Sequence, residues 1–139
     1  MMAPEPRITN LPAFAESNGL LVVPSELETD FGLQRVFFVR GDAGDIRGQH
    51  AHRQCSQLLV CVTGSVEVLA SNGATERRHR LDDPTIGLLV PPMIWCEQVY
   101  ESKGSVLLVL CDREYDEADY IRDRDEYDRL THDPAVVAP

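Results

Sequence analysis

Residues 44–64 of the chain, GDIRGQHAHRQCSQLLVCVTG, carry its strongest structural signal. Two histidines stand one residue apart in this segment, His50 and His52, and an apolar run and a turn signal at Thr63-Gly64 follow them. Because strand side chains alternate between two faces, this spacing predicts that both imidazoles lie on one side of a strand, about 7 Å apart along the chain. Imidazole titrates near neutral pH, so the pair can serve as metal ligands or as a general acid and base.

Short runs of β-forming residues continue on both sides of the histidine pair, separated by turn signals such as Ser71-Asn72-Gly73 and Asp82-Asp83-Pro84. Many strands at this spacing, with no helical periodicity between them, favour an antiparallel all-β sandwich or barrel. A double-sheet jelly roll fits the pattern best. We expect strands at 20–23, 35–39, 57–62, 65–70, 75–81, 87–90, 98–100 and 105–111.

Two of these runs, 58–62 and 106–111, are almost unbroken apolar stretches, which predicts that both of their faces are covered. The opposite sheet covers one face. For the other face we expect a second copy of the chain, in a homodimer.

The segment 112–130 is dense in Asp, Glu, Arg and Tyr, and it predicts one or two short helices packed on the outside of the barrel. Residues 131–139 are expected to form a loose end. No repeat or linker divides the chain, so we expect a single domain over residues 1–139 with its core at about 18–125. The main apolar anchors expected in the segment are Tyr115, Tyr120, Ile121 and Leu130.

The 139 residues suffice for one substantial core, because 43% of them are hydrophobic. The formal net charge of -10 repels phosphate backbones and anionic lipids, so we expect no nucleic-acid and no membrane partner. The start of the chain lacks the regions of a signal peptide, and no apolar run approaches the roughly 20 residues needed to span a bilayer. We therefore expect a cytoplasmic protein whose four cysteines, without CxxC spacing, are reduced and packed.

The spacing around the histidine pair resembles the first motif of the cupin superfamily: a Gly, five residues, His-x-His, three or four residues, a Glu, six residues and a Gly. Gly44 and Gly64 fit this frame, but Gln57 stands at the Glu position. The second cupin motif brings a further His, and its counterpart within the segment 91–96 is Cys96. An amide and a thiol complete a poorer ligand set than three histidines and a carboxylate, so proton transfer is favoured over metal binding.

Longer strings are similar to the nucleotide-sugar 3,4-ketoisomerases, cupin enzymes that act on dTDP-4-keto-6-deoxyglucose. The similarity spans roughly residues 18–125, and its most specific parts are RGQHAH at 47–52 and YDEADYIR at 115–122. It implies a dimeric isomerase without a metal or other cofactor. Such an enzyme moves the ketone of the sugar from C4 to C3 through an enediol or enediolate, in deoxysugar biosynthesis. Further strings that carry the similarity lie at 35–39, 57–65, 84–88, 91–95 and 107–110.

Carried over by position, the resemblance makes His50 and His52 the acid/base pair. The resemblance also implies that Arg47 faces the diphosphate of the substrate or its developing oxyanion. Gln57, Trp95 and Phe38 are expected to line the pocket.

Phe38 leaves an alternative open. It stands where the family often has a tyrosine whose hydroxyl helps in the pocket, and phenylalanine cannot donate a hydrogen bond. A non-catalytic cupin that binds a sugar nucleotide is therefore one alternative. A metal-dependent, dioxygenase-like cupin is another, and it would use the same two histidines as ligands, with Gln57 or Cys96 completing the shell.

Overall fold

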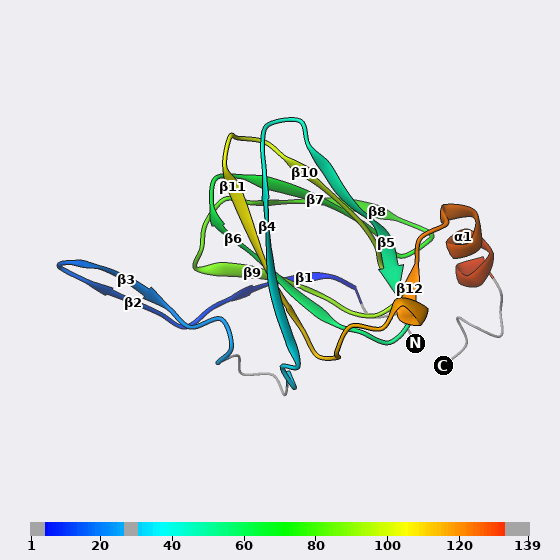
Figure 1. Ribbon diagram of the computed structural model, residues 1–139, viewed down its shortest axis with the longest axis horizontal. Coiled ribbons are helices and arrows are strands. Elements are labelled where there is room, and N and C mark those ends of the chain that lie inside the picture. Colours follow the sequence, from blue (N-terminus) through cyan, green and yellow to red (C-terminus); the bar gives the residue numbers. More distant parts are fainter. Residues whose placement is uncertain (1–4, 27–30, 133–139) are drawn as a thin grey trace.

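The computed structural model describes residues 5–26 and 31–132, and two five-stranded antiparallel sheets face each other in it (Figure 1). The predicted all-β double-sheet jelly roll is confirmed. The first sheet has the order β1 (Arg7–Asn10), β9 (Ile86–Val90), β6 (Gln57–Thr63), β11 (Ser105–Cys111) and β4 (Arg35–Gly41). The second sheet has the order β12 (Tyr120–Ile121), β5 (Ile46–His52), β10 (Trp95–Tyr100), β7 (Val66–Ser71) and β8 (Glu76–Leu81).

The other described elements lie outside these two sheets. A hairpin of β2 (Ala13–Glu16) and β3 (Gly19–Val22) projects away from the barrel in Figure 1. A 3-10 helix, η1 (Glu117–Asp119), leads into β12, and the helix α1 (Arg124–His132) follows it. Within residues 5–26 and 31–132, no helix is both long and apolar enough to cross a membrane.

The inner faces of the two sheets enclose one hydrophobic core, because alternate residues of each strand point inward. Cys96 and Tyr100 of β10 face Leu107 and Val109 of β11 in this core. The close fit shows at Gly41, where a Cβ atom would lie 2.5 Å from the Tyr100 ring. Glycine is therefore required at the end of β4 for the aromatic ring to pack.

A second apolar cluster covers the outer face of the first sheet. Leu58, Val60 and Leu110 are buried there against Leu11, which precedes the hairpin. The expectation that the run 58–62 is covered on both faces holds for these residues, and the chain's own segment supplies part of the outer cover.

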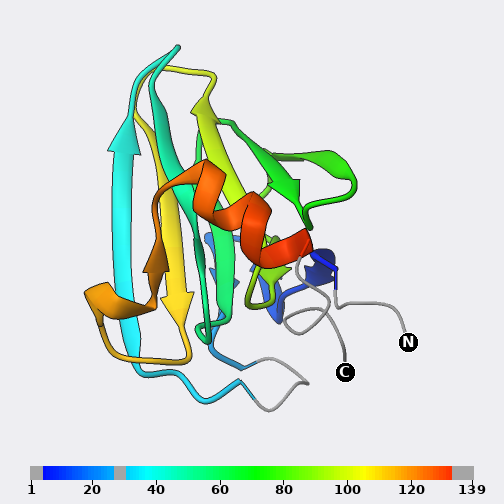
Figure 2. The ribbon, with the colours of Figure 1, turned by 90° about the vertical axis from the view of Figure 1, so that its right-hand side faces the viewer.

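The helix α1 lies against the outer face of the second sheet (Figure 2). Tyr127, which is fully buried, holds the helix there. The Tyr127 hydroxyl lies 2.8 Å from both the Ser71 and the Met93 carbonyl oxygens. Its ring packs 5.6 Å from the ring of Trp95. The docking of α1 therefore holds the segment that follows β12 against the second sheet.

The expected strands all occur, with ends shifted by three residues or fewer. The strands β1, β2 and β12 were not expected, because they are short and do not show a clear apolar alternation. The predicted short helices after residue 112 are confirmed. The expected loose end at 131–139 is corrected at its start, because Thr131 and His132 belong to α1, and residues 133–139 lie outside the described residues.

Candidate active site

His50 and His52 lie on β5 with their ring centroids 5.0 Å apart and their planes nearly perpendicular. Ala51, between them, points to the outer face and is buried in the cluster under α1. The alternation predicted from the His-x-His spacing therefore places both imidazoles together on the inner face. His50 is half-buried, whereas His52 is only 7% exposed.

A β-bulge brings Arg47 to the same face as His50. The pairing of β5 with β10 shifts between Cys96, which lies opposite His50, and Gln98, which lies opposite Arg47. Cys96 and Gln98 are two residues apart and share the inner face, and residues directly opposite each other in a sheet also share a face. Gly48 and Gln49 absorb the extra residue with φ values of 83° and 56°. Without this bulge, Arg47 would point away from the histidines.

The C-terminal strand β12 covers the histidine pair. Tyr120 lies opposite His52 in the pairing of β12 with β5. Its ring centroid is 4.4 Å from that of His52 and 5.0 Å from that of His50. The guanidinium of Arg35 donates to the Tyr120 hydroxyl over 3.2 Å, and that of Arg122 lies 4.3 Å from the Tyr120 ring centroid. Two cations therefore flank the imidazoles.

Asp119 fixes the orientation of His52. The Nδ1 atom of His52 lies 3.0 Å from the Asp119 Oδ2 atom, and the same carboxylate accepts the backbone N–H groups of Gln54 and Cys55 at 2.7 and 3.3 Å. A carboxylate can only accept, so we assign the proton to Nδ1. The Nε2 atom of His52, which is buried and has no hydrogen-bond partner among the described residues, then carries a free lone pair.

His50 has the same tautomer for a different reason. Its Nδ1 atom lies 3.0 Å from the Gly48 carbonyl oxygen, which is also only an acceptor. Desolvation lowers the pKa of His50 to about 4, against the opposing effect of this bond. Desolvation also lowers the pKa of His52, against the opposing effect of Asp119. Both imidazoles are therefore neutral near pH 7, with an unprotonated Nε2.

The structure brings together only some of the residues expected at the site. Gln57 is buried on the inner face and donates to the Cys111 sulfur over 3.4 Å. Trp95 packs on the outer face, beneath α1, and its indole N–H donates to Glu97 over 3.4 Å. Phe38 is 70% exposed and alternates with the inward-facing Phe37. His50, His52 and Gln57 thus share the inner face of the barrel, and the register places Arg47 on the same face, where it is exposed to solvent. Trp95 and Phe38 lie on outer faces.

Four residues near the imidazoles were not predicted from the sequence to belong to the site: Arg35, Asp119, Tyr120 and Arg122. Their only signal was membership in the strings at 35–39 and 115–122, which carried the family resemblance. Nothing in those strings indicates that β12 pairs with β5 and so brings these residues to the histidines.

All four cysteines are free and buried. Burial raises the pKa of Cys96 to about 12, which fits a packed thiol. The neighbouring Cys55 thiol, the Gln57 amide and the Arg35 charge lower the pKa of Cys111, against the effect of burial.

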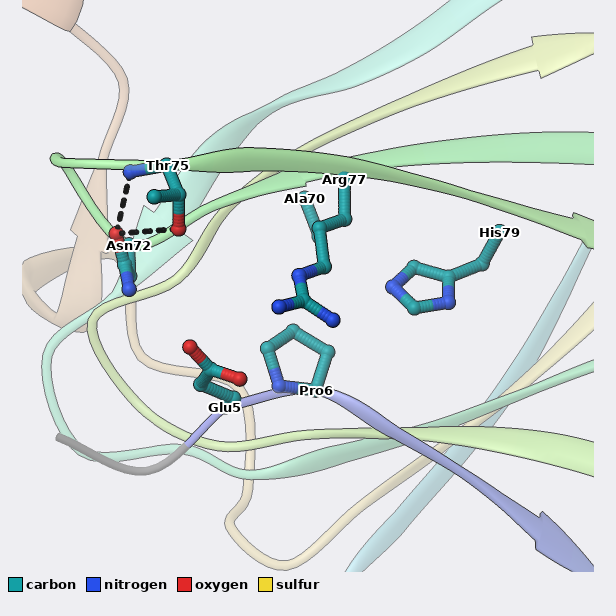
Figure 3. A pocket seen from close by; sticks show the side chains of 7 residues that line it. All are labelled: Glu5, Pro6, Ala70, Asn72, Thr75, Arg77 and His79. Carbon is teal, nitrogen blue, oxygen red and sulfur yellow. Dashed lines mark hydrogen bonds between the residues drawn. The ribbon is translucent and has the colours of Figure 1, made fainter. Parts of the chain in front are cut away.

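A small cavity lies elsewhere in the sandwich, between the residues that precede β1 and strands β7 and β8 (Figure 3). Its volume of about 10 Å³ has room for one water molecule. A polar cleft of about 680 Å³ runs along the segment 112–116 and reaches Asp119. The small cavity is lined by Glu5, Pro6, Ala70, Asn72, Thr75, Arg77 and His79, and these residues are distinct from the ones described above around the histidine pair.

Unprotonated imidazole nitrogens beside hydroxyl and guanidinium donors, on the inner face of the barrel, are suited to an enzyme that transfers protons. Comparison with known proteins narrows this class. The chain belongs to the family described as FdtA: WxcM-like, C-terminal, whose model matches residues 4–132.

Characterised relatives agree with this assignment. A TDP-4-oxo-6-deoxy-alpha-D-glucose-3,4-oxoisomerase of Aneurinibacillus thermoaerophilus is 36% identical over 125 residues, which are 88% of this chain and 90% of that protein. The sugar 3,4-ketoisomerase QdtA of Thermoanaerobacterium thermosaccharolyticum, solved with TDP, has a TM-score of 0.85 at 32% identity, over 92% of this chain and 95% of that one. A His-to-Asn variant of QdtA, solved with TDP-4-keto-6-deoxyglucose, has a TM-score of 0.88 at 29% identity, over 99% and 100% of the two chains. The resemblance to sugar 3,4-ketoisomerases is confirmed.

Proposed function

We propose that this protein is a 3,4-ketoisomerase that moves the ketone of a TDP-4-keto-6-deoxyhexose from C4 to C3. One observation carries the proposal: two neutral imidazoles with free Nε2 atoms lie within 5.0 Å of each other and of the Tyr120 ring. The family's solved members with TDP and with TDP-4-keto-6-deoxyglucose support the choice of substrate.

His50 is the base in this proposal, because it is half-buried and open to a ligand, whereas His52 is enclosed. Its Nε2 atom removes the proton at C3 of the sugar, and the electron pair of that C–H bond forms a C3–C4 double bond. The C4 carbonyl oxygen becomes an oxyanion. The Tyr120 hydroxyl and the Arg35 guanidinium are the donors placed to stabilise it.

The second half of the reaction returns a proton to C4. The C4 oxygen takes up a proton to give the enediol, the C3 hydroxyl loses its own, and C3 becomes the ketone as C4 is protonated. His52 is the proposed relay for these protons. Its bond to Asp119 stabilises the imidazolium that forms whenever His52 holds a second proton.

Arg47 and Arg122 provide local positive charge in a chain whose formal net charge is -10. A diphosphate is attracted by guanidinium groups, which match phosphate oxygens with paired donors. Arg47 lies on the inner face and has no ion-pair partner among the described residues, whereas Arg122 is held by a bidentate bond to Glu117 at 2.7 and 3.0 Å. We assign the diphosphate to Arg47.

Incubation with TDP-4-keto-6-deoxyglucose in deuterium oxide tests the proposal. The expected result is a new 3-keto sugar with deuterium at C4. His50→Asn and His52→Asn are each expected to lower kcat by about 10²–10⁴-fold while TDP binding is retained. His79→Asn, on β8, is the matched control and is expected to keep its rate. Absence of both a new ketone and deuterium in the ring contradicts the proposal.

We also propose that the enzyme is a homodimer, on the evidence of its uncovered apolar side chains. Phe14 and Leu21 lie opposite each other on the projecting hairpin and are 52% and 57% exposed. An isolated two-stranded hairpin is marginally stable in water at best. Val36 and Phe38 on the outer face of β4 are 53% and 70% exposed, so the hairpin of a second copy laid on this face would cover both sets.

Light scattering tests the dimer. Phe14→Asp combined with Leu21→Asp is expected to give a monomer, and Leu20→Asp on the other face of the hairpin is the matched control. A wild-type protein that is monomeric at micromolar concentration contradicts this part of the proposal. A cytoplasmic location, expected from the sequence, stays a prediction.

A further inference from the structure

Three potential metal ligands of different chemistry converge beside the proposed active site. One ligand atom each of His52, Cys55 and Asp119 lies within 4.8 Å of the other two. His52 ends β5, Cys55 lies in the turn before β6, and Asp119 closes η1. Only His52 belongs to the cupin metal frame considered from the sequence, so this triad is a different site.

The burial of the triad distinguishes it from an exposed acidic cluster. The side chains of His52 and Asp119 are 8% and 12% exposed, and Cys55 is 5% exposed. The Asp119 carboxylate is already oriented by three N–H donors, so little further ordering is needed to present it to an ion.

Imidazole nitrogen, thiolate sulfur and carboxylate oxygen together are a ligand set that Zn²⁺ accepts. Zn²⁺ holds such ligands at about 2.0–2.3 Å, which places neighbouring ligand atoms roughly 3.3–3.8 Å apart in a tetrahedral site. His52 Nδ1 and Asp119 Oδ2 are already 3.0 Å apart, and the Cys55 sulfur lies within 4.8 Å of both, so the sulfur has to move by at most roughly 1–1.5 Å. We propose that His52, Cys55 and Asp119 form a site for Zn²⁺ or a similar thiophilic divalent cation, and that the bound ion inhibits the isomerase.

Binding exchanges protons for the metal. The Cys55 thiol, which donates to the Ser56 carbonyl oxygen over 3.3 Å, loses its proton to solvent and becomes a thiolate ligand. The His52 Nδ1 lone pair binds the ion, and the proton that Nδ1 carried moves to Nε2 of the still neutral ring. A water molecule or hydroxide occupies the fourth position.

The inhibition follows from this change of tautomer and depends on the proposed function. In the metal-free protein, Nε2 of His52 is an acceptor that can relay a proton. In the metal-bound protein, Nε2 is an N–H donor and Asp119 no longer stabilises an imidazolium. The ion therefore removes the relay without occupying the position of the sugar.

Cobalt binding tests the site independently of activity. Titration with Co²⁺ is expected to give one equivalent of binding and a near-ultraviolet thiolate-to-cobalt absorption band. Cys55→Ser is expected to lose the band and to weaken Zn²⁺ binding by about 100-fold or more. Cys61→Ser, in the core of β6, is the matched control and is expected to retain the band. No saturable binding, or an unchanged band in Cys55→Ser, overturns the proposed site.

The activity measurement tests the inhibition. Zn²⁺ is expected to lower the wild-type rate at least 10-fold, with recovery on adding a chelator, while Cys55→Ser keeps its basal rate and resists Zn²⁺. Equal inhibition of the variant overturns the inhibitory role. If the wild-type protein shows no isomerase activity, the proposed function fails, whereas the cobalt band still reports on the metal site.

Discussion

His52 Nδ1 lies 3.0 Å from Asp119 Oδ2, although 67 residues separate them in the chain. The pair joins β5 to the segment that leads into its edge neighbour β12, and it fixes which nitrogen of His52 carries the proton. The proposed acid/base chemistry therefore depends on a contact between the middle of the chain and its C-terminal part.

Asp119→Asn tests this dependence. An amide at this position can present its N–H₂ group to His52, which would force the proton onto Nε2 and remove the free lone pair. We expect kcat to fall by about 10²–10⁴-fold with little change in KM. Steady-state kinetics measure this, and thermal unfolding confirms that the variant is folded. A variant with a raised KM and unchanged kcat contradicts the positioning role.

The low pKa of His50 predicts acid sensitivity of the fold. Its folded-state pKa is about 4, whereas a histidine in the unfolded chain titrates near 6.5. Between these values the unfolded state binds more protons, so the free energy of unfolding falls as the pH is lowered. The contribution of neutral His50 to the free energy of unfolding is complete above about pH 6.5. It is lost as the pH falls toward 4, at up to about 1.4 kcal/mol per pH unit. Urea unfolding of wild-type protein and His50→Asn measures it, and identical pH slopes contradict it.

The same shift predicts the acid limb of the rate. If His50 is the base, kcat/KM reports its ionisation in the free enzyme. We expect a plateau that extends well below pH 6.5, with the fall toward an apparent pKa near 4. A fall centred at the usual histidine value would show that another group controls the rate.

Tyr120→Phe isolates the hydroxyl next to the imidazoles. The phenylalanine ring keeps the packing on His50 and His52 but removes the group that contacts Arg35. We expect kcat to fall by about 10²-fold, as for the loss of one oxyanion donor. Tyr115→Phe is the matched control, because its hydroxyl bonds Glu117 over 2.6 Å at the surface. Equal rates of the two variants contradict a role for Tyr120.

Gly48→Ala tests the bulge that turns Arg47 inward. Gly48 has a φ of 83°, and a Cβ atom there would lie 3.1 Å from the Cys96 carbonyl oxygen. We expect a loss of stability of about 1–2 kcal/mol and a raised KM for the nucleotide sugar. Gly44→Ala, with a φ of 91° and no atom within 4 Å of the new Cβ, is expected to lose stability with an unchanged KM. Denaturant unfolding of both variants measures the loss of stability, and steady-state kinetics measure KM.

The barrel could be predicted because strand alternation is a local property. The placement of His50 and His52 on one face follows directly from their spacing, and the core strands follow from apolar runs bounded by turns. The inward position of Arg47 could not be derived from alternation, because it depends on two positive φ values at the bulge.

The other placements that the sequence did not indicate have one physical cause, which is tertiary context. Trp95 was expected in the pocket, but its packing partner Tyr127 lies on a helix whose docking site no local pattern reveals. Phe38 was expected beside the substrate, but β4 presents Phe37 to the inside instead. Asp119 gains its role only through the pairing of β12 with β5.

The position of β12 at the edge of its sheet has a consequence for limited proteolysis. Two residue pairs join β12 to β5, whereas β5 is also paired along its length with β10. A cut between β11 and η1 would therefore separate the segment that carries Asp119 and Tyr120 from the chain of the barrel strands. The cleaved protein is expected to lose the proposed turnover before it loses its fold.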